Sequence, residues 1–115
     1  MSPPGVAEDD LGALADQAGG PAEALVIVGI YLEHLTRRRD AVLGAGDSRA
    51  LAEAAHALRS PSMLVGAREL AGICARVERR ALRGLRVPGW DLAALGRECE
   101  RVRAALARLV ADASG

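Results

Sequence analysis

The sequence predicts an all-α protein, an antiparallel four-helix bundle with a short additional helix at the N-terminal end. Apolar residues recur at alternating steps of three and four in several segments, whereas no segment shows the strict alternation of a β-strand. Aromatic residues make up only 2% of the chain, so Leu, Val, Ile and Ala must fill the core. Such a composition suits closely packed helices better than a sheet, and the short connections between the periodic segments are typical of a bundle.

The N-terminal residues 1–7 are expected to be a disordered tail, because they are rich in Pro and Gly. Residues 8–113 are expected to form one helical bundle, since a chain of 115 residues holds a single core. A first short helix is predicted from about Glu8 to Ala18, with Leu11 and Leu14 as its apolar contacts.

The second helix is predicted to begin at Pro21, after the pair Gly19-Gly20, because the missing N–H of proline costs nothing at the first helical position. Gly44-Ala45-Gly46 is expected to end it. Its predicted apolar stripe is Leu25, Val28, Leu32, Leu35 and Val42.

Asp47 or Ser48 is expected to cap a third helix, since either side-chain oxygen can accept a hydrogen bond from a free N–H of the first turn. The predicted seam of this helix runs through Leu51, Ala55 and Leu58. A fourth helix is predicted to begin near Gly66, with the stripe Ala67, Leu70, Cys74, Val77 and Ala81.

The last helix follows a loop from Gly84 to Pro88 and has the most regular stripe. Asp91 is expected to cap it, and Trp90 and Leu95 are spaced to form a hydrophobic staple. The stripe consists of Leu92, Leu95, Cys99, Val102, Leu106 and Leu109.

The charge balance excludes some classes of partner. The chain has 15 basic and 15 acidic residues and a formal net charge of zero, which argues against nucleic-acid or anionic-membrane binding. The sequence has neither a signal peptide nor an apolar run long enough to span a membrane. Two cysteines without framework spacing favour a reduced compartment, so we expect a cytoplasmic, monomeric protein.

The segment around His56 carries the chemistry. His56 directly follows the seam residue Ala55, which places it beside the buried stripe, and Arg59 is its neighbour one helical turn later. A neutral imidazole is a nitrogen nucleophile near pH 7, and an arginine can donate hydrogen bonds to phosphoryl oxygens. Small residues around the pair leave room for a second protein. These features indicate a phosphoryl-acceptor site.

The same segment resembles the signature of the histidine phosphotransfer (HPt) domain family. In that pattern a histidine is followed by Leu, then Lys or Arg, then small residues, then Gly-Ala ten and eleven positions on. This chain has His56, Leu58, Arg59, Ser60, Gly66 and Ala67 at those positions, and Leu70, Cys74 and Glu78 match the pattern of the next helix. The resemblance covers roughly residues 8–112.

The resemblance implies a phosphorelay intermediate that is not itself an enzyme. His56 would accept a phosphoryl group from an aspartate of a response-regulator receiver domain and pass it to another receiver. A hybrid sensor histidine kinase is the other implied partner, and the receiver would supply Mg²⁺. Glu78 would accept a hydrogen bond from the ring of His56, while Ser60 and Met63 would contact the partner. No Gly-rich phosphate loop occurs, so no cofactor or metal of the chain's own is expected.

Pro61 departs from the family pattern. In mid-helix a proline removes one backbone hydrogen bond and crowds the carbonyl of Ala57. It also biases Ser60, which stands where the family often has Gly, away from helical angles. The helix is therefore expected to kink or end about one turn after His56, which bears on docking more than on chemistry.

Other interpretations remain open at this stage. A docking module of the same fold that carries no phosphoryl group is one, and a structural helix bundle is another. His34 has no motif around it and is interpreted as an ordinary boundary residue. Cys74 and Cys99 are interpreted as core residues and not as zinc ligands, because no close ligand pair accompanies them. The arginine runs at residues 37–39 and 79–83 are expected to be solvated or to line a docking surface.

Overall fold

The computed structural model describes Val6 and residues 8–114, and it confirms the predicted fold class. Five α-helices follow one another along the described chain. They are α1 (Glu8–Ala18), α2 (Pro21–Leu43), α3 (Ser48–Leu64), α4 (Arg68–Leu82) and α5 (Gly89–Ser114).

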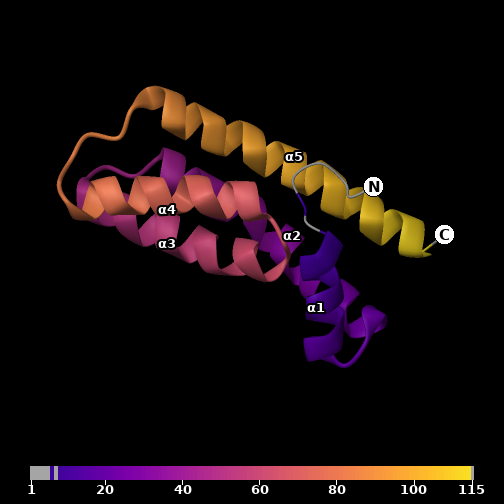
Figure 1. The fold of residues 1–115 in the computed structure, drawn as a ribbon. Helices are drawn as coiled ribbons and strands as arrows, with labels where there is room; N and C mark the ends of the chain where they lie inside the picture. The colour runs from indigo at the N-terminus through magenta and orange to yellow at the C-terminus, as the bar shows by residue number, and fades with distance from the viewer. Residues whose placement is uncertain (1–5, 7, 115) are drawn as a thin grey trace.

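Helices α2 to α5 form the four-helix bundle (Figure 1). Helix α2 packs against α3 and α5, and α4 packs against the same two helices, so the four surround one core. The short α1 packs on α2 outside this square. The molecule measures 45 × 23 × 23 Å, and α1 lies toward the end of this rod opposite the α4–α5 loop.

The core is built almost entirely from aliphatic side chains, as the composition predicts. Leu58 of α3, Val77 of α4 and Leu95 and Leu106 of α5 are fully buried, and burial of such side chains is the main favourable term in folding. On α2 Val28, Leu35 and Val42 are buried as predicted, whereas Ala24 and Tyr31 are buried in place of Leu25 and Leu32. Leu25 and Leu32 are partly exposed at the edge of the buried stripe.

The helix boundaries follow local backbone chemistry. Gly19 and Gly20 adopt positive φ angles of 100° and 144° between α1 and α2, a conformation that glycine reaches without a Cβ clash. Asp47 caps α3, because its carboxylate accepts a hydrogen bond from the N–H of Ala50 at 2.7 Å. These two turns set the antiparallel course of α1, α2 and α3.

Pro61 does not end α3, although the sequence predicts a kink or an end about one turn after His56. The helix continues one turn beyond it to Leu64, and the N–H of Val65 still bonds the carbonyl of Pro61 at 3.2 Å. Burial of Leu58, Ser62 and Val65 holds this last turn against the bundle, and the hydroxyl of buried Ser62 shares a hydrogen bond of 2.8 Å with that of Tyr31. Packing thus offsets the backbone hydrogen bond that proline cannot make.

The predicted start of α5 is wrong in two respects. The helix begins at Gly89 and Asp91 lies inside its first turn, where the N–H of Asp91 bonds the carbonyl of Pro88. Asp91 is not a cap but a buried partner of Arg76 on α4, at 3.1 Å. The expected staple with Leu95 does not form, because Trp90 is 69% exposed while Leu95 is fully buried.

Helix α1 is tied to the rest of the fold by both apolar and charged contacts. Leu14 is buried, and Asp10 forms an ion pair with Arg68 at the start of α4. Val6 is also buried against the core. The rest of the tail predicted for residues 1–7 lies outside the described residues.

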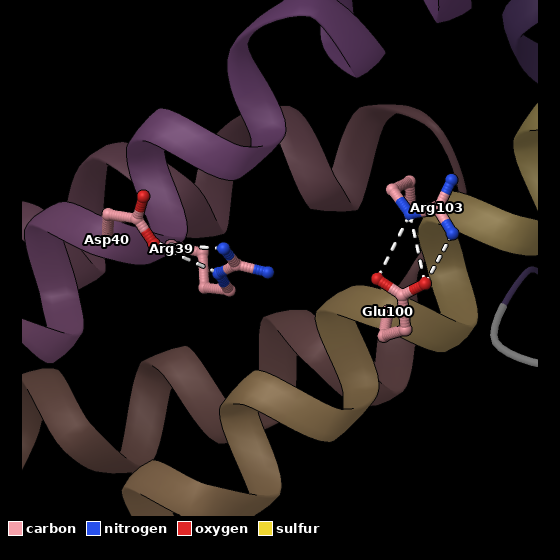
Figure 2. A network of polar contacts seen from close by, with 4 residues as sticks. All are labelled: Arg39, Asp40, Glu100 and Arg103. Atoms are coloured by element: carbon pink, nitrogen blue, oxygen red, sulfur yellow. Dashed lines mark hydrogen bonds and ion pairs between the residues drawn. The ribbon is translucent and has the colours of Figure 1, made fainter.

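Two ion pairs, one on α2 and one on α5, each lie within a single helix (Figure 2). Arg39 bonds Asp40 at 3.0 Å on α2, and Arg103 bonds Glu100 on α5. The arginine hydrogen bonds lower the pKa of Glu100. Neither pair crosses from one helix to the other, although the charge of Arg39 on α2 also contributes to the lowered pKa of Glu100 on α5.

Charge is distributed unevenly along the rod. None of the 15 arginines precedes Arg37, whereas six of the 15 acidic residues do. The early part of the chain includes α1, at one end of the rod, while the arginine-rich segment 76–86 leads into the α4–α5 loop at the other end. Among the described residues, no helix combines the length and apolar character needed to cross a bilayer.

Candidate functional site

The site is centred on His56, in the middle of α3. Its neighbours Ala55 and Leu58 are fully buried, so they fix the rotation of the helix and turn His56 to the surface. The His56 side chain is 58% exposed. The expectation that His56 stays accessible beside a buried stripe is therefore confirmed.

Glu78 reaches His56 from the adjacent helix α4. Its neighbour Val77 is fully buried, which places Glu78 at the α3–α4 junction with only 14% of its side chain exposed. Oε2 of Glu78 lies 2.9 Å from Nδ1 of His56. This distance is that of a hydrogen bond, so the structure brings together the two side chains that the resemblance paired.

Arg59 completes the cluster from α3. Its Nε lies 3.3 Å from Oε1 of Glu78, close enough for an ion pair although the atoms are not aligned for a hydrogen bond. A terminal nitrogen of Arg59 also lies 3.2 Å from Nδ1 of His56. The guanidinium therefore sits at the Nδ1 edge of the ring beside Glu78, and its contact with phosphoryl oxygens stays a prediction.

The two contacts at Nδ1 cannot both be hydrogen bonds. Nδ1 donates if it carries the proton and accepts if it does not. A carboxylate can only accept, so the 2.9 Å contact with the largely buried Glu78 requires a proton on Nδ1. We assign the proton there from this bonding network. In the neutral ring Nε2 then carries the free lone pair, and Nε2 has no hydrogen-bond partner among the described residues.

His34 offers an internal comparison, because it also has an arginine three residues later. A terminal nitrogen of Arg37 lies 2.8 Å from Nδ1 of His34, and no carboxylate among the described residues bonds this ring. Arg37 can only donate, so Nδ1 of His34 accepts and the proton resides on Nε2. The two histidines thus have opposite tautomers.

A groove of about 590 Å³ runs along the α3–α4 junction beside His56 and Glu78. Its remaining walls come from Ser48, Arg49, Ala52, Glu53, Ala81, Leu82 and Gly84. The sequence analysis missed this groove. Arg49, Glu53 and His56 are spaced for one helical face, but that spacing alone gives no sign of a concave surface.

Ser60 and Met63, predicted to contact a partner, lie on the other side of the cluster. Both are exposed, and with Arg59 they border a second depression of about 450 Å³ that extends over Ala71, Gly72 and Ala75 of α4. Small residues on α4 keep this surface open. The structure therefore places both residues on an accessible surface next to His56.

The cysteines are core residues, and Cys74 lies near enough to Arg59 and Glu78 for their charges to act on its pKa. Cys74 and Cys99 are buried free thiols, and burial raises the pKa of each to about 12. No group of three or more His, Cys, Asp or Glu side chains within the described residues could hold a metal ion.

Comparisons with known proteins identify the family. The model of the Hpt domain family matches residues 26–112, which include α3, α4 and the whole His56 cluster. The chain belongs to the Hpt domain family. Such domains carry phosphoryl groups in two-component phosphorelays, together with receiver domains and histidine kinases. A histidine phosphotransfer role in a phosphorelay follows for this chain.

A solved structure extends the likeness beyond the family match. Histidine-containing phosphotransfer protein B (HptB) from Pseudomonas aeruginosa PAO1 is similar to this Hpt domain with a TM-score of 0.84 and 27% sequence identity. The alignment covers 96% of this chain and 98% of HptB. A search of curated proteins gives no match.

Proposed function

We propose that His56 is the phosphoryl acceptor of this Hpt domain, and that it receives the group from an aspartate of one receiver domain and donates it to another. The observation that supports this most directly is the 2.9 Å contact between Glu78 and Nδ1, which leaves the lone pair of Nε2 free on an exposed ring. A nucleophile must be unprotonated and accessible to an incoming phosphorus atom.

The transfer step requires no general base from this chain, because the attacking nitrogen carries no proton. The Nε2 lone pair attacks the phosphorus of an aspartyl phosphate, and the N–P bond forms as the bond from phosphorus to the aspartate oxygen breaks. The aspartate leaves as a carboxylate, and the ring gains positive charge. Glu78 can offset that charge through the Nδ1–H hydrogen bond, which strengthens as the ring becomes cationic.

The other groups have supporting parts in the proposal. The Nε of Arg59 pairs with Oε1 of Glu78, the carboxylate oxygen that does not contact His56, at 3.3 Å. Ser60 and Met63 contact the docked receiver. The receiver would bring Mg²⁺ and most of the catalytic groups, so this protein acts as a phosphoryl carrier and is not an enzyme.

Two matched variants test the acceptor. His56→Gln and His34→Gln each remove one histidine that is followed by an arginine at the third position. After incubation with a receiver phosphorylated on its aspartate, His34→Gln should take up label as the unchanged protein does, and His56→Gln should take up none. The label should be acid-labile and base-stable, as phosphohistidine is.

The same experiment separates the other interpretations. If His56→Gln binds the receiver and the unchanged protein binds without taking label, the domain is a docking module. If His56→Gln is labelled as well as the unchanged protein, the acceptor lies elsewhere and the proposal is wrong.

A further inference from the structure

Another concave surface lies at the α4–α5 corner. It shares no lining residue with the groove beside His56 or with the depression at Ser60 and Met63. Its volume is about 320 Å³, and it is lined by Arg76, Arg79, Arg80, Arg83, Leu85, Pro88, Trp90 and Asp91. The four arginines follow the spacing i, i+3, i+4 and i+7, which gathers them on one face of α4. Glu78 follows Arg76 by two positions and therefore points to roughly the opposite side of that helix.

Two of the arginines are held in place by the fold. Arg76 bonds Asp91 at 3.1 Å, and the Asp91 side chain is only 3% exposed, so this carboxylate is covered. The Nε of Arg80 donates to the carbonyl of Arg86 at 2.9 Å. A guanidinium has five donors, so each of these arginines keeps N–H groups for a ligand and has already lost much of its rotational freedom.

The other two arginines are uncompensated. Arg79 and Arg83 are exposed, and no carboxylate of the described residues pairs with either. Together with the covered Asp91, the surface carries a clear positive excess in a chain whose net charge is zero. Guanidinium groups bind phosphate oxygens in a bidentate manner.

Trp90 adds a flat apolar surface to the rim of this cavity. It is 69% exposed, because the first turn of α5 directs it away from Leu95 and the core. An exposed tryptophan beside several arginines offers a stacking face for a planar ring next to cations for negative charge. Both features face one cavity whose volume is at the small end of the range for small-molecule sites.

We propose that this arginine–tryptophan cavity binds a nucleoside di- or triphosphate, with the base stacked on Trp90 and the phosphates held by Arg79, Arg80 and Arg83. The site replaces the backbone amides of a Gly-rich loop by arginine side chains, which is why no phosphate-loop motif marks it in the sequence. The limited volume and the neutral charge of the whole chain favour a small ligand over a single-stranded nucleic acid. Binding there leaves His56 accessible.

Trp90 is the only tryptophan in the chain, so its fluorescence reports on this site directly. Titration with ATP should quench it with saturation at one ligand per chain, and calorimetry should give the same affinity. Adenosine and inorganic tripolyphosphate should each bind at least about tenfold more weakly, because each supplies only one of the two contacts. Equal binding of either one, absence of saturation, or tighter binding of an oligothymidylate than of ATP would overturn the proposal.

Variants connect the binding to the named residues. By calorimetry, Arg79→Ala, Arg83→Ala and Trp90→Leu should each weaken ATP binding by about tenfold, the scale of losing one charge-assisted or stacking contact. Arg97→Ala, which removes an exposed arginine of α5 outside the cavity, should leave the affinity unchanged. His56→Gln should also bind ATP normally, so this result is independent of the acceptor proposal. Equal loss in Arg97→Ala would show a non-specific charge effect and contradict the site.

Discussion

His56 and His34 differ in what contacts the same ring atom. At His56 a carboxylate from another helix meets Nδ1 at 2.9 Å, and at His34 an arginine meets it at 2.8 Å. The first neighbour places the proton on Nδ1 and frees Nε2, and the second does the reverse. In the proposed function, Glu78 is therefore the residue that leaves the outer nitrogen of His56 unprotonated.

Replacement of Glu78 tests this assignment. Glu78→Gln keeps an oxygen that can accept from Nδ1–H, whereas Glu78→Leu removes it at similar size. We expect Glu78→Leu to slow phosphoryl uptake by about 10- to 100-fold, the scale of one hydrogen bond to a charged group, and Glu78→Gln to slow it less. Single-turnover labelling from a phosphorylated receiver measures both rates. Equal rates for Glu78→Leu and the unchanged protein would remove Glu78 from the mechanism.

Arg59 is expected to act through Glu78, because it pairs with that carboxylate at 3.3 Å. Arg59→Ala alone should slow transfer by roughly one to two orders of magnitude. When combined with Glu78→Leu, it should cause little further loss, since groups that act as a unit are not additive. Transfer rates of the two single variants and the double variant provide the cycle. Fully additive losses would instead assign Arg59 a separate contact, such as one with the phosphoryl oxygens.

The small residues and the family pattern around His56 and Arg59 were sufficient to single them out, since His34 and Arg37 have the same helical spacing without that pattern. The pairing of Glu78 with His56 came from the family pattern, since a contact between α3 and α4 depends on how two helices are rotated against each other. The groove beside His56 and the exposure of Trp90 could not be predicted. The groove depends on how α3 and α4 pack against each other, and the exposure of Trp90 depends on where α5 begins.

At the scale of an element, α3 shows how packing overrides local preference. Pro61 disfavours a helix, yet α3 continues to Leu64 because Leu58, Ser62 and Val65 are buried on the same side. The predicted helices are confirmed in number and order since each has a long apolar stripe. Their ends are harder to predict, because a side chain expected to cap a helix, such as Asp91, can instead bond a partner on another helix.

Pro61→Ala should stabilise the protein. Alanine restores the N–H that can bond the carbonyl of Ala57, a gain of up to about 3 kcal/mol, while the unfolded chain becomes freer by about 0.4–1 kcal/mol. We expect the free energy of unfolding in urea to rise by about 1–2 kcal/mol, and Ser60→Ala, at the exposed neighbouring position, to change it by less than about 0.5 kcal/mol. A destabilised Pro61→Ala variant would show that the proline is required by the packing of this turn.

At the scale of the whole molecule, the dependence of stability on alkaline pH reports on the burial of three core side chains. The chain has no lysine. Cys74, Cys99 and Tyr31 are its side chains whose ordinary pKa lies above about 8 and below that of arginine. Burial raises the pKa of both thiols from 9.0 to about 12 and raises that of Tyr31 as well. A raised pKa in the folded state favours folding at pH values below the unfolded pKa, and this contribution is lost as the pH rises.

Stability should therefore fall steadily between pH 9 and pH 11. Each thiol contributes a decrease of up to about 1.4 kcal/mol per pH unit once it ionises in the unfolded chain. Urea unfolding at a series of pH values measures the slope, and the double variant Cys74→Ala/Cys99→Ala should show a shallower one near pH 9–10. A free energy of unfolding that stays constant from pH 8 to pH 11 would contradict the burial of these groups.

The uneven placement of charge gives this neutral molecule a permanent electric dipole along its long axis. At physiological ionic strength charges are screened over about 8 Å, which is much shorter than the 45 Å rod. An approaching protein therefore meets one end of the rod at a time. It experiences an acidic or a basic surface and not the zero net charge of the whole molecule. Collisions are oriented before contact, and the rate of encounter should vary with salt even though the net charge is zero.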